Sequence, residues 1–281
     1  AYQIPSSSRT SRGVPIVQML SISKSEKITS IISVSEFKED IFLVMLTRQG
    51  YIKKTALSAF SNIRTNGLIA ISLGEGDQLR WVRLTREEDS VILGTRLGMA
   101  IHFHADHQQL RPLGRATRGV KSMRLKKKDE LISMDILSAQ VTIGVEESQD
   151  NEEVLEIEPE ELTEKETSLG PWILAITNKG YGKRIPITQF RLQRRAGMGV
   201  RAIKFKSGKD NLTSLRVVNA EDELMIVSNR GIIIRQAVKA ISLQSRSATG
   251  VRVQRLDEDD AIAAVALVPP VPEEDGENEE I

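Results

Sequence analysis

Short apolar stretches alternate with polar turns along the chain, and four segments open on the same plan. Each has an apolar strand, a turn that ends in glycine and a second strand. These segments begin at Ile41, Val91, Trp172 and Glu223, and their turn glycines are Gly50, Gly98, Gly180 and Gly231. A hairpin turn often needs a positive φ, which a residue with a Cβ reaches only at a cost. The pattern therefore predicts four β-hairpins.

A second half-unit follows each hairpin, with a glycine, a third strand, an acidic turn and a fourth strand. The glycines of these half-units are Gly67, Gly119, Gly199 and Gly250. A fifth copy, RGVPIVQML at Gly13, has no hairpin before it. The period is about 50 residues outside one acidic insertion. Short strands at this spacing predict an all-β, propeller-like array of about five four-stranded blades, the first of them incomplete.

The repeat also sets the expected domain boundaries. We predict a partial first blade at 1–40, blades at 41–88, 89–138, 170–220 and 221–268, a flexible acidic insertion at 139–169 and a disordered acidic tail at 269–281. Helical periodicity is scarce, and a short helix is expected only in the insertion.

Charge is segregated along the 281 residues, although the formal net charge is only +1. Residues 146–166 carry eleven acids and one lysine, and the tail carries six acids and no basic residue, so the rest of the chain has a net charge of +17. Such a field favours a polyanionic partner, with nucleic acid ahead of an anionic membrane because no basic amphipathic helix is visible. A merely solubilising surface is the alternative.

Composition excludes several classes of protein. The chain has no cysteine, which rules out a disulfide framework and a thiolate zinc site. No secretory signal opens it, and no apolar run approaches the roughly 18 residues that span a bilayer. We expect a cytoplasmic protein without a membrane partner. Because the chain opens on Ala1 in the middle of a repeat, we expect a piece of a longer protein.

The basic residues keep the period of the repeat. The first series, four residues after the turn glycines, is Lys54, His102, Arg184 and Arg235. The second, four residues before the second glycines, is Arg9, Arg115, Arg195 and Arg246, with Arg64 one position out of phase. The third, two residues after the second glycines, is Lys121, Arg201 and Arg252. The neighbouring cations Arg12, Lys53, Arg118, Lys183 and Arg194 complete the predicted DNA-binding set.

Equivalent positions of successive blades lie around one rim of a propeller, so these cations are expected to form a curved stripe. Such a stripe suits sequence-independent phosphate contacts along bent double-stranded DNA. The competing interpretation is that Lys and Arg on outer strands only keep sheet edges soluble and unpaired.

Several segments resemble the C-terminal domain of bacterial DNA gyrase A, which belongs to the type IIA topoisomerase family. VMLTRQGYIKKTALSAF, LAITNKGYGKRIPITQF, RTNGLIAISLGEGDQL and RATRGVKSMRL carry the likeness, which runs from Tyr2 to about Val268 outside the insertion. The resemblance implies a β-pinwheel whose blades exchange strands and whose basic rim wraps DNA. It also implies support for ATP-dependent negative supercoiling by the holoenzyme, with the rest of gyrase A and gyrase B as partners and a nucleoid-associated location.

The same resemblance implies no catalytic residue, metal, cofactor or small-molecule substrate in this segment. The tyrosine that links to DNA lies elsewhere in the family's proteins, so Tyr2, Tyr51 and Tyr181 are not assigned that role. The alternatives are the corresponding domain of topoisomerase IV and, from another class, a protein-interaction propeller that docks an acidic partner.

Two departures from the family stand out. The family's disc normally has six blades, whereas this chain lacks the opening one. The family's Q-R-R-G-G-K-G box has its nearest match in a later blade, where the lysine is missing. This degenerate box consists of Gln193, Arg194, Arg195, Ala196, Gly197, Met198 and Gly199. We expect it to face DNA, with glycines that allow close approach to phosphate.

Other motifs favour structural roles. His102, His104 and His107 have a spacing that metal sites use, but no fixed carboxylate partner is evident. The acids from Asp257 to Asp260 occupy the turn that is acidic in the other units, which favours a turn over a two-metal site. GEGDQL at Gly74 lacks the ending of a P-loop. Trp81 and Trp172 fall in apolar strand patterns and are expected in the core.

Overall fold

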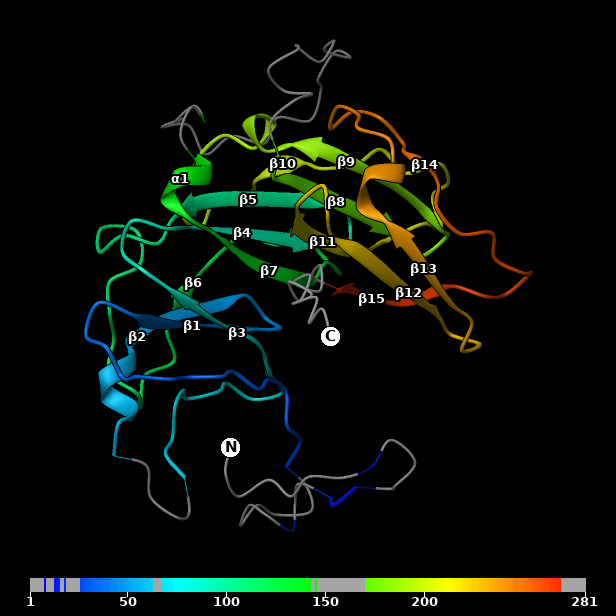
Figure 1. Cartoon of the computed structure of the whole chain (residues 1–281). Coiled ribbons are helices and arrows are strands. Elements are labelled where there is room, and N and C mark those ends of the chain that lie inside the picture. The colour runs from blue at the N-terminus through cyan, green and yellow to red at the C-terminus, as the bar shows by residue number, and fades with distance from the viewer. Residues whose placement is uncertain are drawn as a thin grey trace, which may run out of the picture.

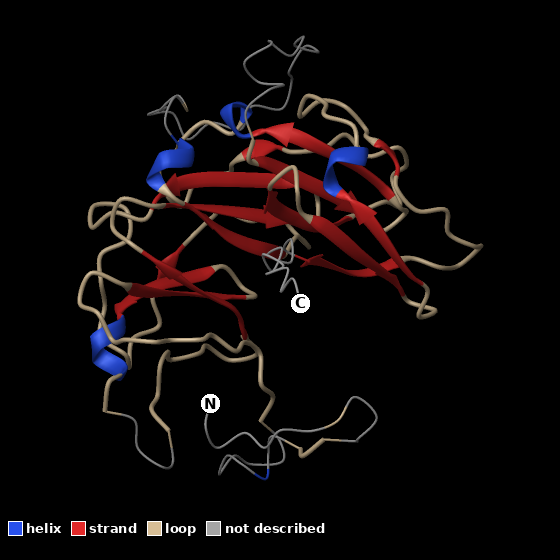
Figure 2. Ribbon diagram, viewed as in Figure 1, coloured by secondary structure: helices blue, strands red, loops and turns tan. Residues whose placement is uncertain are grey.

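The computed structural model describes Ser8, 13–15, Gln18, 26–62, 67–142, Val145 and 170–268. Antiparallel β-sheets stand side by side around a common middle, and the helical segments are short (Figure 1, Figure 2). The all-β, propeller-like fold is confirmed.

Each predicted hairpin is present. The hairpins are β1 (Phe42–Thr47) with β2 (Tyr51–Ala56), β4 (Ser90–Thr95) with β5 (Met99–His104), β8 (Trp172–Thr177) with β9 (Tyr181–Pro186), and β12 (Glu223–Ser228) with β13 (Ile233–Ala237). We name each sheet by its hairpin. The short helical turns are η2 (Leu57–Phe60), α1 (Ala139–Thr142), η3 (Ile187–Gln189) and η4 (Val238–Ala240).

Each hairpin has an inner strand from its own unit and, in three sheets, an outer strand from the next unit. The inner strands are β3 (Leu79–Thr85), β7 (Leu131–Leu137), β11 (Leu212–Val218) and β15 (Ile262–Val268). The outer strands are β6 (Val120–Lys121), β10 (Val200–Arg201) and β14 (Val251–Arg252). The first sheet, for example, has the order β3-β1-β2-β6. The strand exchange that the resemblance implied is therefore confirmed.

The four strands of a blade do not all come from one unit. Strands β6, β10 and β14 each join the sheet of the preceding unit, and the β12–β13 sheet has three described strands. A pattern of apolar residues marks a strand but does not say which neighbouring sheet the strand joins.

The hydrophobic cores lie between successive sheets rather than inside one. Val91 and Leu93 of β4 pack toward the β1–β2 sheet, whereas Ile92 packs toward the β8–β9 sheet. Strands β4 and β8 are buried along their whole length because sheets cover both of their faces. Strand β12 alternates between buried and accessible positions, since it lies in the last sheet. This two-sided burial explains why interior strands read as continuous apolar runs.

The inner strands lie against one another, β7 between β3 and β11, and β11 beside β15. At their shared level Asp135 of β7 is buried between two arginines. Its carboxylate lies 3.6 Å from Arg83 Nε and 3.0 Å from Arg216 Nε, and it accepts a 3.0 Å hydrogen bond from the Val217 amide. A buried carboxylate needs such partners, so this trio fixes the spacing of three blades.

The described residues of the partial first blade form no strand. Residues 26–40 and 67–73, which correspond to an inner and an outer strand, have no regular structure. Ile69 is 71% exposed as a result. Among the described residues, neither segment has a hairpin as its hydrogen-bonding partner.

The second glycines allow the exchanged strand to cross the preceding hairpin. Gly119 and Gly199 have φ values of 91° and 78°, and an added Cβ would clash with the carbonyl oxygens of Ile52 and Ala100. Only glycine satisfies both the backbone conformation and the close approach at these positions.

Substituting Gly199 with alanine is expected to lower the free energy of unfolding by roughly 2 kcal/mol or more, because strain and a backbone clash combine. Denaturant unfolding measures this effect. Gly208→Ala is the matched control, since nothing lies within 4 Å of an added Cβ there and the backbone needs no positive φ. Equal stability of the two variants would contradict the proposed role of Gly199.

Candidate nucleic-acid interface

The outer strands and the loops that precede them form one connected edge of the molecule. We call 120–124, 200–204 and 251–255 the outer segments, and 112–118, 192–198 and 243–249 the rim loops. The Arg124 amide donates to the Gly197 carbonyl at 2.8 Å, and the Lys204 amide donates to the Ala248 carbonyl at 3.3 Å. The first two outer segments are thus hydrogen-bonded to the rim loop of the following unit, which makes the edge continuous across three blades.

Exposed cations follow this edge. The exposed ones are Arg118, Lys121, Arg124, Arg194, Lys204, Arg252 and Arg255, and Arg201 is half-buried. Arg124, Lys204 and Arg255 were absent from the predicted set. They stand five residues after the second glycine in three units, so the same internal alignment could have found them. The outer segments therefore carry cations at two phased positions, not one.

The residues four positions after the turn glycines mainly form hydrogen bonds to the next blade. Lys54 is fully buried and its ammonium donates to the Ala105 carbonyl. Arg184 is half-buried, donates from Nε to the Ile241 carbonyl at 2.7 Å and stacks on Trp172. Lys54 is not accessible to phosphate, so its predicted DNA contact is wrong.

His102 also links two blades by hydrogen bonds, and it does not contact DNA. It is 1% exposed, with Nδ1 2.8 Å from the Phe190 carbonyl and Nε2 2.7 Å from the Ser90 hydroxyl. Desolvation lowers the pKa of His102 to about 4, so the ring is neutral at physiological pH. A neutral ring that donates from Nδ1 and accepts at Nε2 satisfies both partners, and it offers no charge to phosphate.

The last residue of this series, Arg235, has its partner within its own sheet. Arg235 is exposed and forms an ion pair with Glu223 on the neighbouring strand of its own sheet. Its charge is therefore already partly neutralised, which makes it a weaker candidate for DNA contact than the cations of the outer segments.

Two predicted lysines, Lys53 and Lys183, are completely buried beneath the rim loops. Lys183 Nζ donates to the carbonyls of Ser245, Arg246 and Ala248 at 2.6–2.8 Å. Lys53 Nζ donates to the backbone carbonyls of Gly114, Arg115 and Thr117 in its rim loop, and to the backbone carbonyl of Ala70. Neither ammonium can reach a phosphate directly, so the prediction that they contact DNA is wrong.

The arginines four positions before the second glycines are half-buried and bind the preceding unit. Arg195 Nε donates to the Gln109 carbonyl at 2.7 Å, and its Nη1 donates to the Lys121 carbonyl. Arg246 makes the equivalent bond to Arg201, and Arg115 donates to Ala59. All three keep partial exposure, so their charges still contribute to the field of the rim.

The degenerate box is the rim loop next to β10. Arg194 is exposed, whereas Gln193 is buried. The backbone amide of Gln193 donates to the His102 carbonyl. Ala196 adopts a φ of 65°, a conformation that glycine takes more readily. Only part of the box therefore faces solvent, with one arginine directed outward and the other holding the loop down.

Aromatic rings lie among the rim cations. The guanidinium of Arg118 lies 3.8 Å from the centre of the Tyr51 ring, and Arg252 donates to the Tyr181 hydroxyl at 3.0 Å. These hydrogen bonds and nearby charges lower the pKa of Tyr181. Stacking orders the long cationic side chains and so lowers the entropy that they lose on binding phosphate.

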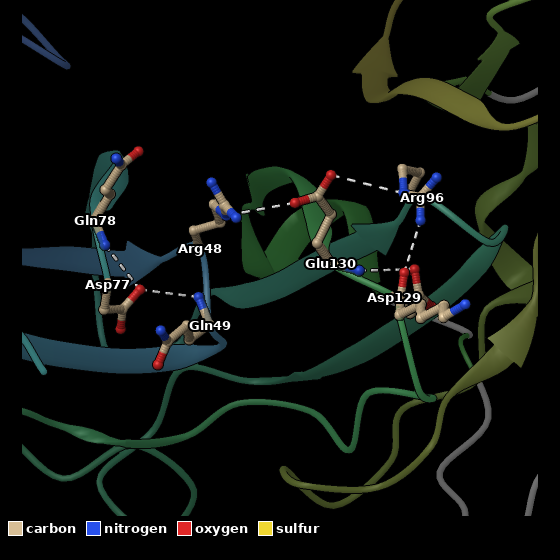
Figure 3. A network of polar contacts seen from close by, with 8 residues as sticks. Arg48, Gln49, Asp77, Gln78, Arg96, Asp129 and Glu130 are labelled. Atoms are coloured by element: carbon tan, nitrogen blue, oxygen red, sulfur yellow. Dashed lines mark hydrogen bonds and ion pairs between the residues drawn. The ribbon is translucent and has the colours of Figure 1, made fainter. Parts of the chain in front are cut away.

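The acidic turns cap the hairpins. Asp77 Oδ1 accepts the Gln49 amide at 3.0 Å, and Asp129 accepts the equivalent amide of Leu97 (Figure 3). Asp260 accepts the amide of Arg230 in the same way and is thus part of a turn, as predicted. Within the described residues no group of His, Asp and Glu has the arrangement of a metal site.

Glu130 continues this network between blades. It lies 3.4 Å from Arg48 Nε and 3.6 Å from Arg96 Nε, so it bridges the turns of two successive hairpins (Figure 3). These two arginines are used in ion pairs, which distinguishes them from the cations of the outer segments.

Three predicted DNA contacts, Arg9, Arg12 and Arg64, lie outside the described residues, as do most of the acidic insertion and the whole acidic tail. In the part of the chain that the structure describes, no helix has the length and apolar character needed to cross a membrane.

Comparison with known proteins identifies the family. The model of the DNA gyrase C-terminal domain, beta-propeller, matches residues 1–35, 42–86, 89–138, 171–219 and 222–269. The DNA gyrase A protein of Synechocystis sp. is 69% identical over 277 residues, which are 98% of this chain and 32% of that protein. The chloroplastic/mitochondrial DNA gyrase A protein of Arabidopsis thaliana is 39% identical over 285 residues, 99% of this chain and 29% of that protein.

Solved structures share the fold at lower identity. The C-terminal domain of DNA topoisomerase IV superposes with a TM-score of 0.73 at 24% identity, covering 92% of this chain and 71% of that one. The DNA gyrase A C-terminal domain gives 0.69 at 23% identity, covering 91% and 75%. The chain spans about a third of the length of the curated relatives named above. By its sequence and its exchanged blades, this chain belongs to the DNA gyrase C-terminal domain family.

Proposed function

We propose that this chain binds duplex DNA along its outer rim and bends it, as the DNA-wrapping part of a gyrase-type topoisomerase. The observation that supports the proposal most strongly is the continuous edge of outer segments and rim loops, with cations at two phased positions in each of three units. A row of charges fixed on a convex surface contacts phosphates regardless of base sequence.

The interface lacks the features of base recognition. The described rim has neither a helix nor a long projecting strand pair to enter a major groove, since its outer strands are only two residues long. Contacts from such an edge reach the DNA backbone. Bending a site of 20–30 base pairs costs on the order of 1–6 kcal/mol, which several phosphate contacts offset.

In this proposal the chain performs no chemistry. Strand cleavage and ATP hydrolysis belong to the remainder of gyrase A and to gyrase B, which would be its partners in a cytoplasmic, nucleoid-associated holoenzyme. Wrapping presents a neighbouring DNA segment to that enzyme with one handedness and so supports negative supercoiling. No cofactor or small-molecule substrate is assigned to this segment. The sequence relatives favour gyrase over topoisomerase IV, whose domain is related here through its fold.

DNA affinity is expected to fall steeply with salt and to rise with duplex length until the rim is filled. The slope of log K against log salt reports about 0.9 per neutralised phosphate. Fluorescence anisotropy with duplexes of increasing length measures both quantities. A protein-interaction propeller predicts instead that short and long duplexes bind equally well, and a flat salt plot would exclude phosphate contacts.

Removing two outer-segment cations should weaken binding for all sequences alike. The double variant Arg124→Ala/Lys204→Ala is expected to reduce the salt slope by about 2. Lys38→Ala/Arg86→Ala is the matched control, because both residues are exposed cations outside the rim, paired with Glu36 and Asp40. Equal slopes for the two double variants would place the DNA elsewhere.

The acidic insertion and tail are expected to compete with DNA for the rim. Residues 146–166 and 273–281 together carry seventeen carboxylates tethered to the same chain. Deleting 146–166 and 269–281 should tighten DNA binding at low salt, with a smaller effect at high salt because screening weakens the competition. Unchanged low-salt affinity would count against this role.

A further inference from the structure

Two of the three rim loops rest on a buried lysine, and the third does not. Lys53 and Lys183 stand three residues after the turn glycines of the β1–β2 and β8–β9 sheets, where the β4–β5 sheet has Ile101. Ile101 is part of the hydrophobic core. The rim loop over Ile101 is held instead by the side chain of Arg195 and by the backbone amide of Gln193. The joints between blades are therefore of two chemical kinds.

At the lysine joints the ammonium serves as the centre around which the loop folds. The Nζ of Lys183 has all three of its protons directed at carbonyls of 245–248, and Lys53 has more carbonyl acceptors than protons. A neutral amine has only two protons to donate and no charge to attract the remaining oxygens. Protonation thus decides how many of the loop carbonyls each lysine can satisfy.

Resting on the proposed DNA-wrapping function, we propose that Lys53 and Lys183 are positioning residues of the interface. Their side chains, when protonated, hold two rim loops in place for duplex DNA, and DNA binding shifts both lysines from the neutral to the protonated form. They act through the loops, since neither ammonium is exposed. The negative charge of phosphates outside the loop favours the ammonium inside it, which couples binding to protonation.

The electrostatic surroundings place both lysines in a range where this coupling is measurable. Burial, and then the charge of Arg246, lowers the pKa of Lys183 to about 7, and burial lowers the pKa of Lys53 to about 8. Among the described residues, no carboxylate is a counter-ion of either lysine. Lys54 points away to Ala105, with Glu87 and Asp106 on its side of the sheet, and Arg184 lies against Trp172.

One anion, Glu26, lies near the Lys53 joint, since it lines the same groove as Ala70, Gly114 and Thr117. The other charged groups beside the joints are cations: Arg115 and Arg118 flank the loop over Lys53, whereas Arg252 and Lys206 surround Tyr181 beside Lys183. Phosphates on the rim loops would add negative charge to both joints, so DNA binding would raise the pKa of both lysines.

The coupling has a definite sign. At a pH between the pKa of each lysine in the free protein and its higher pKa in the complex, binding of DNA is accompanied by uptake of protons. DNA affinity therefore falls as the pH rises through about 7 to 9. The stability of the free protein changes in the opposite direction. Between the lowered pKa values and the ordinary lysine value near 10.5, the unfolded chain binds more protons, so these lysines make stability increase with pH. A purely structural role predicts the second trend without the first.

The test is calorimetric titration of the full chain with a long duplex at pH 7.5, in two buffers of different ionisation enthalpy, with affinities followed from pH 6.5 to 9. The wild type is expected to take up protons and to lose about tenfold in affinity over this range. Lys53→Met/Lys183→Met should remove most of both effects. Ile101→Met, at the equivalent position of the β4–β5 sheet, should leave them unchanged.

A conservative variant separates positioning from folding. Lys183→Arg keeps a cation that does not titrate in this range, so it should retain affinity at pH 9 and lose its share of the proton uptake. Binding by the wild type without proton uptake would overturn the proposal even if every variant failed to fold. Uptake that persists in the double methionine variant would also overturn it. A wild type that does not bind long DNA would contradict the wrapping function itself.

Discussion

The structure depends on one interaction, the transfer of each unit's third strand to the hairpin of the unit before it. The strand is only two residues long, so its own ladder contributes little to stability. Three features around the strand fix its position. A glycine with positive φ lets the chain cross the hairpin, and the residue four positions after the turn glycine forms hydrogen bonds to the next blade. An arginine before the strand donates a hydrogen bond to the preceding unit. Because successive outer segments and rim loops bond to one another, this exchange also makes the rim continuous.

The position of a cation within the repeat decides what it does. Three residues after the turn glycine, a lysine lies beneath a rim loop; one residue later, the side chain ties two blades together; on the outer segments, the cation faces solvent. Buried cations carry a desolvation cost that carbonyl oxygens partly offset, whereas exposed ones remain free to exchange counter-ions for phosphate. The two groups are thus interdependent, since the buried cations hold the loops and strands on which the exposed ones are displayed.

Much of this architecture can be predicted from the sequence, because glycines, apolar strands and acidic turns all recur with one period. The hairpins at Gly50, Gly98, Gly180 and Gly231 and the capping acids at Asp129 and Asp260 follow from local turn chemistry. Strand exchange does not, since a strand's apolar pattern is the same whichever sheet it joins. It had to come from the family resemblance.

The candidate site was predicted less well, for a related physical reason. Structural cations recur with the same period as functional ones, so periodicity alone selects Lys54 together with Lys121 and Arg252. Only burial separates them. Lys53 follows Ile52 in a strand pattern that gives no indication of the carbonyls above it, because those carbonyls come from a loop some sixty residues away.

The most direct measurement of DNA wrapping is the ligation of nicked circular DNA in the presence of saturating protein, followed by separation of the topoisomers. If duplex DNA curves around the rim, the closed circles will show a shifted linking number of one consistent sign that grows with the amount of bound protein. Circles that keep the linking number of protein-free controls, although the protein is bound, would contradict the account.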